Sequence, residues 1–180
     1  RVGALFSKSG LTPNQLTFLS IISALITFCF LVDKNFLLAA LFFSLTAILD
    51  VADGAVARLD KKTTAKGAYY DTIADRYTEF IIILGLLFAD LPFLYMSSPF
   101  WLLLYLFGST MTTYSKAAAK EKNLVSGLSG GILERGERMI LLLMGLLLAN
   151  LAKIYLTYVI IILAILSNVT ALQRIRKAIR

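Results

Sequence analysis

Four aspartates in one short part of the chain have the types and spacing that could do chemistry. Asp50 and Asp53 are three positions apart, and Asp71 and Asp75 are four apart. On an α-helix, either spacing places both carboxylates on one face. The 17 residues between the two pairs include the turn-compatible segment 60–67, DKKTTAKG, so we expect two antiparallel helices whose acidic faces converge.

Converging carboxylates predict a divalent metal site. A charge at the centre of a membrane helix costs about 2.5–3.5 kcal/mol on insertion scales, and neighbouring carboxylates also repel one another. A bound cation relieves both costs, and oxygen ligands suit Mg²⁺, Mn²⁺ or Ca²⁺. Aspartates at helix ends also lie in the headgroup region without a ligand, but that interpretation explains one aspartate more easily than four.

The rest of the composition restricts the chemistry. The chain has no histidine, so catalysis must use carboxylates, hydroxyls, lysine or arginine. Its single cysteine, Cys29, cannot form an internal disulfide and is predicted to be a small core residue.

Small and basic residues beside the aspartates predict a phosphate site. Gly54 and Ala57 leave the helix face bare, and Arg58 offers a bidentate fork for phosphate. Thr64 and Gly67 add a hydroxyl and a second bare position. Together with a metal, these residues predict a pyrophosphate site with a nucleotide lying on the glycine and alanine.

The elements that must position these residues are membrane helices. Hydrophobic residues make up 58% of the 180 residues, against about 45–50% in soluble domains. Six segments are long and apolar enough to be spans: Leu11–Val32, Phe36–Leu59, Ala68–Ala89, Leu91–Ser115, Gly131–Ala149 and Ile154–Gln173. The predicted fold class is an all-α integral membrane protein with six transmembrane helices and an interfacial N-terminal segment.

The basic residues orient these helices. All 18 lysines and arginines except Lys34 and Lys153 fall at the termini or around the second and fourth connections. The positive-inside rule therefore predicts a multi-pass cell-membrane protein with both termini and the aspartates on the cytoplasmic side. The net charge of +7 follows from this bias and requires no nucleic-acid partner. The C-terminal segment 173–180, QRIRKAIR, is interpreted as an interfacial anchor.

The spacing Asp50-x-x-Asp53-Gly54-x-x-Ala57-Arg58, followed by Gly67-x-x-x-Asp71-x-x-x-Asp75, resembles the signature of the CDP-alcohol phosphotransferase family. The resemblance extends to the six-span layout, and it implies one such domain over residues 1–180. Because the chain begins with Arg1 rather than Met, we expect a fragment, which leaves room for a soluble domain upstream.

The resemblance implies transfer of a substituted phosphoryl group from a CDP-linked lipid alcohol to an acceptor hydroxyl, with release of CMP. It implies two Mg²⁺ or Mn²⁺ ions, one held by Asp50, Asp53 and Asp71 and the other by Asp50, Asp71 and Asp75. Asp75 is also the expected general base. A homodimer embedded in membrane lipids is the expected assembly.

The resemblance also assigns the nucleotide contacts. These expected contacts are Gly54, Ala57, Arg58, Thr64 and Gly67, together with the N-terminal stretch Pro13, Asn14, Gln15 and Leu16. The segment 11–17, LTPNQLT, fits that stretch, and it fits a helix start at the membrane interface equally well.

Three further basic residues bear on the acceptor. Lys116, Arg135 and Arg138 fall at cytoplasmic ends of predicted spans, and the segment 134–138, ERGER, is similar to one in the phosphatidylinositol-phosphate synthase branch, which includes archaetidylinositol-phosphate synthases. The resemblance implies that they bind the phosphate of inositol phosphate. Positive-inside anchoring is the alternative, and the chain departs from that branch at Lys116, where a run richer in arginine is expected.

Other functions remain open at the level of sequence. The acceptor could be glycerol phosphate, serine or another alcohol, and CDP-inositol could be the donor. A small cation transporter could also use the aspartates, although a transporter requires a polar path through the bilayer and the outer halves of the predicted spans are apolar.

Overall fold

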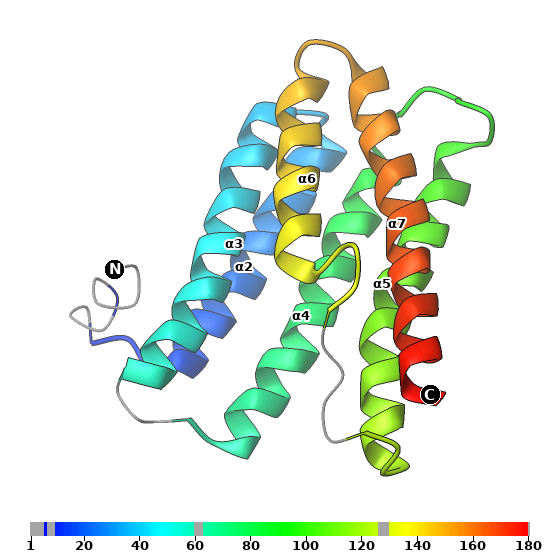
Figure 1. Cartoon of the computed structure of the whole chain (residues 1–180). Coiled ribbons are helices and arrows are strands. Elements are labelled where there is room, and N and C mark those ends of the chain that lie inside the picture. The colour runs from blue at the N-terminus through cyan, green and yellow to red at the C-terminus, as the bar shows by residue number, and fades with distance from the viewer. Residues whose placement is uncertain (1–5, 7–9, 60–62, 126–129, 180) are drawn as a thin grey trace. The chain divides into compact units, whose positions relative to one another are not determined.

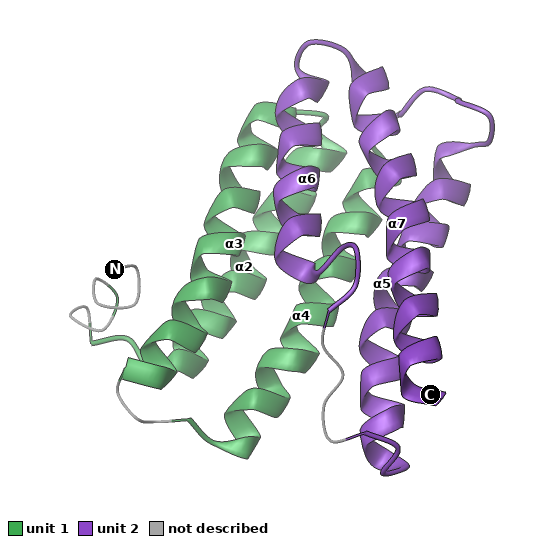
Figure 2. Ribbon diagram, in the orientation of Figure 1, with its two compact units in different colours: residues 1–89 green, residues 90–180 purple. Residues whose placement is uncertain are grey.

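The computed structural model describes Phe6 and residues 10–59, 63–125 and 130–179. These residues form six α-helices, α2 to α7, and the all-α prediction is confirmed for this part of the chain (Figure 1). They divide into two compact units, residues 1–89 and residues 90–180 (Figure 2). The expected interfacial N-terminal segment falls mainly on residues 1–9, of which only Phe6 is described.

Unit 1 contains α2 (Pro13–Val32), α3 (Phe36–Leu59) and α4 (Ala65–Leu86). The start of α2 follows from its sequence, because Thr12 and Gln15 form a capping box and Pro13 stands in the first turn. Thr64 caps α4 by accepting a hydrogen bond of 3.0 Å from the Gly67 N–H. Helix α2 packs against both α3 and α4, so it forms the support for the two acidic helices.

The C-terminal part of α3 is held by a small apolar cluster. Leu16 of α2 packs there with Leu49, Ala52 and Val56 of α3. These three residues lie at helical spacing on one side of α3. Their burial leaves Asp50 on a different face, where it is only half-buried.

Unit 2 contains α5 (Ser98–Glu121), α6 (Arg135–Ala149) and α7 (Lys153–Ile179), with α7 packed against both other helices. The contact between α5 and α7 is close at Gly108, where an added Cβ would lie 2.5 Å from Nδ2 of Asn168. That amide donates hydrogen bonds to the carbonyls of Leu104 and Ala164. Helices α5 and α7 are therefore held together by close packing and by a hydrogen bond between them.

Two predicted spans begin later than the hydropathy pattern indicates. The span expected from Leu91 becomes helical only at Ser98, because Pro92 disfavours helix before it and Pro99 stands in the first turn of α5. The span expected from Gly131 begins at Arg135, because Gly131 has a φ of 141°, which no helix accommodates.

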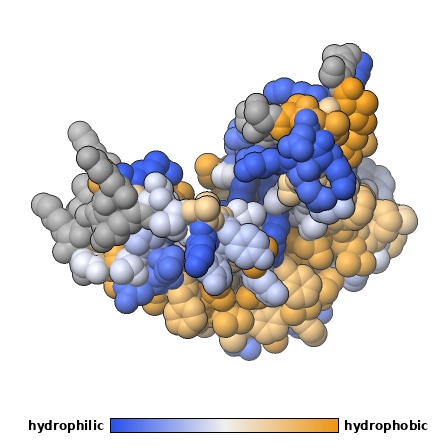
Figure 3. Space-filling model, turned by 90° about the horizontal axis from the view of Figure 1, so that it is seen from below, coloured by the Kyte–Doolittle hydropathy of each residue, from blue (hydrophilic) through white to orange (hydrophobic). Residues whose placement is uncertain are grey.

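By length and apolarity alone, α2, α3 and α7 qualify as membrane-crossing helices among the described residues. Hydrophilic and hydrophobic residues gather in separate areas of the surface (Figure 3). Cys29 is exposed and not a core residue as predicted, since it lies on an outer face of α2.

Candidate active site

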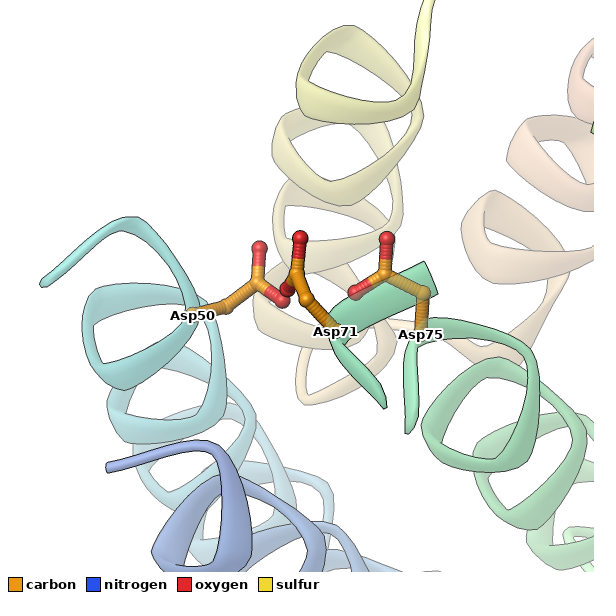
Figure 4. Close-up of side chains that lie close together, drawn as sticks. All are labelled: Asp50, Asp71 and Asp75. Atoms are coloured by element: carbon orange, nitrogen blue, oxygen red, sulfur yellow. The ribbon is translucent and has the colours of Figure 1, made fainter. Parts of the chain in front are cut away.

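Three of the four aspartates meet. Asp50 of α3 and Asp71 and Asp75 of α4 each contribute one carboxylate oxygen to a group in which all three atoms lie within 4.8 Å of one another (Figure 4). All three side chains are half-buried. The i, i+4 spacing on α4 and the packing of both helices on α2 produce this convergence.

The donor set of this triad fits a hard divalent cation. Its three groups are carboxylates from two helices, and oxygen ligands are those that Mg²⁺ and Mn²⁺ prefer. Three carboxylates at this separation also repel one another, and a cation would relieve that repulsion. Asp50, Asp71 and Asp75 are therefore the residues that would hold a metal here.

Asp53 has a different environment from the triad. It is buried, with 4% of its surface exposed, and its Oδ2 accepts a hydrogen bond of 2.6 Å from the Thr17 hydroxyl of α2. Among the described acidic residues, Asp50, Asp71 and Asp75 lie close enough to share one ion, and Asp53 is not part of this group. Asp53 instead lines a neighbouring cavity, to which Asp71 also contributes.

That cavity has a volume of about 390 Å³, within the range of small-molecule sites. Small residues shape its wall, and the guanidinium of Arg58 lies over Gly54, where an added Cβ would be 3.3 Å from Nη1. On the α4 side, the Thr64 hydroxyl lies 3.2 Å from where a Cβ of Gly67 would stand. The cavity therefore places a cation and a hydroxyl, two groups that can bind phosphate, over its two glycines.

Most of the predicted nucleotide contacts line this cavity. They are Pro13, Asn14, Gly54, Ala57, Arg58, Thr64 and Gly67. Gln15 and Leu16 do not belong to its lining: the Gln15 side chain accepts a hydrogen bond from the Thr12 N–H, and Leu16 is completely buried in the apolar cluster.

Four lining residues were not predicted from the sequence: Thr12, Thr17, Thr63 and Ala68. The signal for Thr17 was helical periodicity, since it follows Pro13 by four positions and therefore shares its face. The helix presents only one side to the cavity, so the lining residues of α2 are spaced along one face and are not contiguous.

A buried cationic group lies in unit 2. Arg138, the second arginine of the ERGER segment, is 3% exposed, and its Nη1 donates a hydrogen bond of 3.4 Å to the Thr112 hydroxyl of α5. Arg174 of α7 donates from Nη1 to the Thr112 carbonyl at 2.8 Å and from Nε to the Gly130 carbonyl at 3.0 Å. Two arginines from different helices therefore converge on Thr112.

Arg174 was missed by sequence reasoning, which treated the C-terminal basic segment as an anchor. The available signal was that Arg174 follows Thr170 and Ala171, both buried, at helical spacing. It consequently shares the inner face of α7, unlike the exposed Arg176.

The other predicted acceptor residues are more accessible. Lys116 is exposed on α5, one helical turn after Thr112, and Arg135 is half-buried at the first position of α6. The interleaved glutamates make backbone contacts: Glu137 accepts from the Glu134 N–H at 2.7 Å, and Glu134 accepts from the Gly130 N–H at 3.0 Å. Glu134 also lies 3.9 Å from Arg174.

Comparison with known proteins identifies the chain. Residues 10–171 match the model of the family described as CDP-alcohol phosphatidyltransferase. The matched residues include most of both units. The chain belongs to the CDP-alcohol phosphatidyltransferase family. As a CDP-alcohol phosphotransferase, it is an enzyme that transfers a substituted phosphoryl group from a CDP-alcohol to an acceptor hydroxyl.

Similar proteins come from archaea and bacteria. The phosphotransferase is 34% identical to archaetidylinositol phosphate synthase of Pyrococcus horikoshii over 99% of this chain and 89% of that protein. Its structure matches crystal structures of Mycobacterium tuberculosis phosphatidylinositol phosphate synthase at 26% identity and a TM-score of 0.82. The structure with CDP-DAG bound matches over 98% of this chain and 91% of its own chain. The structure with manganese and citrate matches over 98% of this chain and 87% of its own chain.

These matches and the apolar helices agree on the cellular setting. The CDP-alcohol phosphotransferase is an integral membrane protein with several spans, and its all-helical fold is that of the matched synthase. Its acidic triad is consistent with metal binding. The membrane and enzyme predictions made from the sequence are therefore confirmed.

Proposed function

We propose that this enzyme transfers the phosphatidyl-type group of a CDP-linked lipid to a hydroxyl of inositol phosphate and releases CMP. The observation that carries the proposal is the acidic triad beside a cavity of about 390 Å³, because Asp71 belongs to both. The reaction would take place at the cytoplasmic boundary of the cell membrane, where the positive-inside rule puts the aspartates.

The donor would bind through unit 1. Its nucleotide would lie in the cavity over Gly54 and Ala57, with Arg58 and Thr64 available to its phosphates. Asp50, Asp71 and Asp75 would hold Mg²⁺ or Mn²⁺, and a second ion would draw on Asp53 as well. Metal bound there would neutralise the pyrophosphate and the charge that develops on it.

Asp75 is the proposed general base. The acceptor oxygen forms a new bond to the lipid-side phosphorus while the bond from that phosphorus to the CMP oxygen breaks. The proton of the attacking hydroxyl passes to a carboxylate oxygen of Asp75, which must therefore lie within hydrogen-bond reach of the hydroxyl. Asp75 suits this role because it is half-buried and belongs to the triad.

The acceptor phosphate would bind through the cations of unit 2. Arg138 and Arg174 converge on Thr112, and Lys116 stands one turn further along the same helix face. Glu137 accepts a hydrogen bond from the backbone N–H of Glu134, and Glu134 accepts one from Gly130 and also forms an ion pair with Arg174. Arginine suits this role because its guanidinium donates two parallel N–H hydrogen bonds to phosphate oxygens. We also assign Arg135 to this group.

The names of similar proteins support this acceptor. The Pyrococcus horikoshii relative makes archaetidylinositol phosphate and the Mycobacterium tuberculosis relative makes phosphatidylinositol phosphate, according to their names. Both products contain an inositol phosphate group. We further propose that the enzyme is a homodimer, which a mass measurement in detergent would test.

The deciding experiment measures CMP release from a CDP-linked lipid by the purified full chain, with Mg²⁺ or Mn²⁺, across a panel of acceptors. Inositol phosphate, inositol, glycerol phosphate and serine should be compared at equal concentration. Inositol phosphate should react with the highest kcat/KM. Equal reaction of inositol and inositol phosphate would contradict a phosphate-binding acceptor site, and preference for glycerol phosphate would change the acceptor.

A further inference from the structure

The segment 130–133, which leads into α6, is bound by side chains of α7. The Leu133 N–H donates a hydrogen bond of 3.0 Å to the Thr170 hydroxyl, and the Ile132 N–H donates one of 3.1 Å to Oε1 of Gln173. Both acceptors lie on one side of α7, because they are three positions apart. The two donors need such partners, since α6 has not yet begun at either residue and offers them no carbonyl.

Arg174 follows Thr170 by about one helical turn and extends this contact. Its Nε donates to the Gly130 carbonyl, while its Nη1 donates to the Thr112 carbonyl of α5. One face of α7 therefore binds both the segment before α6 and helix α5. We call the three side chains on this face the α7 clamp: Thr170, Gln173 and Arg174.

Within the α7 clamp, the bond to Thr170 is the buried one. Thr170 has 0% of its surface exposed, and Leu133 has 4%. By contrast, Ile132 is 52% exposed and Gln173 also lies at the surface, so water can replace their bond. Gly131 lies directly on the Thr170 methyl group, since an added Cβ would overlap Cγ2. Thr170 therefore determines where the segment lies on α7.

The position of Leu133 sets the start of α6 and, with it, the position of Arg138. The residue after Leu133 is Glu134, the N-cap of α6, whose carbonyl accepts a hydrogen bond of 3.0 Å from the Arg138 N–H. Arg138 therefore closes the first turn of the helix that the clamp places. Its side chain is buried and reaches Thr112, so its guanidinium has little room to compensate for a displaced backbone.

We propose that Thr170 is a positioning residue for the acceptor site, because it fixes the start of α6 and thereby the guanidinium of Arg138. The inference rests on the proposed function, which assigns Arg138 to the acceptor phosphate. Thr170 acts only through the backbone of Leu133 and touches neither substrate. Loss of its hydroxyl should therefore weaken binding of the phosphorylated acceptor and leave the donor, which would bind through unit 1, unaffected.

The test compares Thr170→Val with Thr157→Val in the full-chain enzyme. Both threonines are buried on α7, but the Thr157 hydroxyl donates to the Lys153 carbonyl of its own helix. Thr170→Val should raise KM for inositol phosphate roughly fivefold or more and leave kcat and the donor KM within about twofold. Thr170→Ser, which retains the acceptor oxygen, should restore the KM, and Thr157→Val should change none of these values.

A second measurement does not depend on turnover. Hydrogen exchange in the peptide covering residues 130–138 should be faster in Thr170→Val than in Thr157→Val, because the Leu133 N–H has lost its acceptor. Unchanged exchange would overturn the clamp. Faster exchange with an unchanged acceptor KM would overturn the positioning role, and so would an equal rise in the KM values of donor and acceptor.

Gln173→Leu tests the same connection if Thr170→Val does not fold, because it removes an acceptor at an exposed position. It should raise both the exchange of residues 130–138 and the KM for inositol phosphate, each by less than Thr170→Val, and a change in exchange alone would contradict the inference. Failure of the proposed function would appear in the wild-type enzyme, as absence of CMP release with inositol phosphate. The exchange comparison would still test the clamp in that case.

Discussion

The hydroxyl of Thr17 donates a hydrogen bond of 2.6 Å to Oδ2 of Asp53, although 36 positions separate the two residues. It connects α2 to α3 in the wall of the cavity that both residues line. A buried carboxylate requires such a partner, because a carboxylate that loses its hydrogen bonds on burial is costly. This bond therefore holds Asp53 in the wall of the cavity of about 390 Å³.

Thr17→Val should remove the hydrogen bond that connects Asp53 to α2. The change keeps the side-chain shape and removes the donor, so stability should fall by about 1.5–3 kcal/mol, the usual contribution of a hydrogen bond to a charged group. KM for the donor should rise, and Thr17→Ser should restore it. Thr72→Val is the matched control, since the Thr72 hydroxyl donates to the Ala68 carbonyl within its own helix. Thermal unfolding and donor kinetics measure the two effects, and equal behaviour of both valine variants would contradict the assignment.

Removal of divalent metal should abolish CMP release. EDTA removes the ion that the triad would hold, and added Mn²⁺ or Mg²⁺ should restore turnover. Asp50→Asn should weaken Mn²⁺ binding measured by calorimetry and lower activity in parallel. Asp33→Asn, at the exposed end of α2, should leave both unchanged. Full turnover in EDTA would refute a metal-dependent mechanism.

Asp75→Asn should separate binding from catalysis. If Asp75 takes the acceptor proton, kcat should fall by roughly 10²–10⁴-fold, the usual contribution of a general base. The dissociation constant for the CDP-linked donor should change only a few-fold, since Asp50 and Asp71 remain. Single-turnover kinetics and equilibrium binding give the two quantities. A parallel loss of donor affinity and rate would make Asp75 a metal ligand without a role in proton transfer.

Arg138→Ala should raise KM for the acceptor and leave donor binding intact. A hydrogen bond to a charged group contributes about 1.5–3 kcal/mol, so the increase should be roughly tenfold or more. Arg174→Ala should also raise KM for the acceptor, because Arg174 and Arg138 both donate hydrogen bonds to Thr112. The control is Lys122→Ala, whose side chain is 70% exposed. Wild-type acceptor kinetics in both arginine variants would remove these residues from the acceptor site.

Membrane orientation can be tested by cysteine labelling. In a Cys29→Ser background, Lys34→Cys in the turn after α2 and Lys66→Cys in the first turn of α4 provide two exposed positions. The distribution of lysine and arginine predicts that a membrane-impermeant reagent applied from the cytoplasmic side labels only Lys66→Cys. Labelling of both positions from one side would contradict the orientation.

Most of the acidic site could be predicted from the sequence because its geometry is local. The spacings of Asp50, Asp53, Asp71 and Asp75 define helix faces through the period of the α-helix alone. The same holds for Gly54 and Arg58, whose four-residue spacing places the guanidinium over the glycine. Apolar runs and the distribution of basic residues likewise indicated a helical membrane protein before any contact was known.

Only the tertiary structure decided which of these residues meet. Helix spacing alone placed all four aspartates at one site, but packing on α2 bonds Asp53 to Thr17, apart from the triad that could share an ion. Arg174 joined Arg138 at Thr112 because three helices of unit 2 pack together, over a sequence separation of 62 positions between Thr112 and Arg174. Helical periodicity determines the face on which a side chain lies, whereas the partner of that face depends on how distant helices pack.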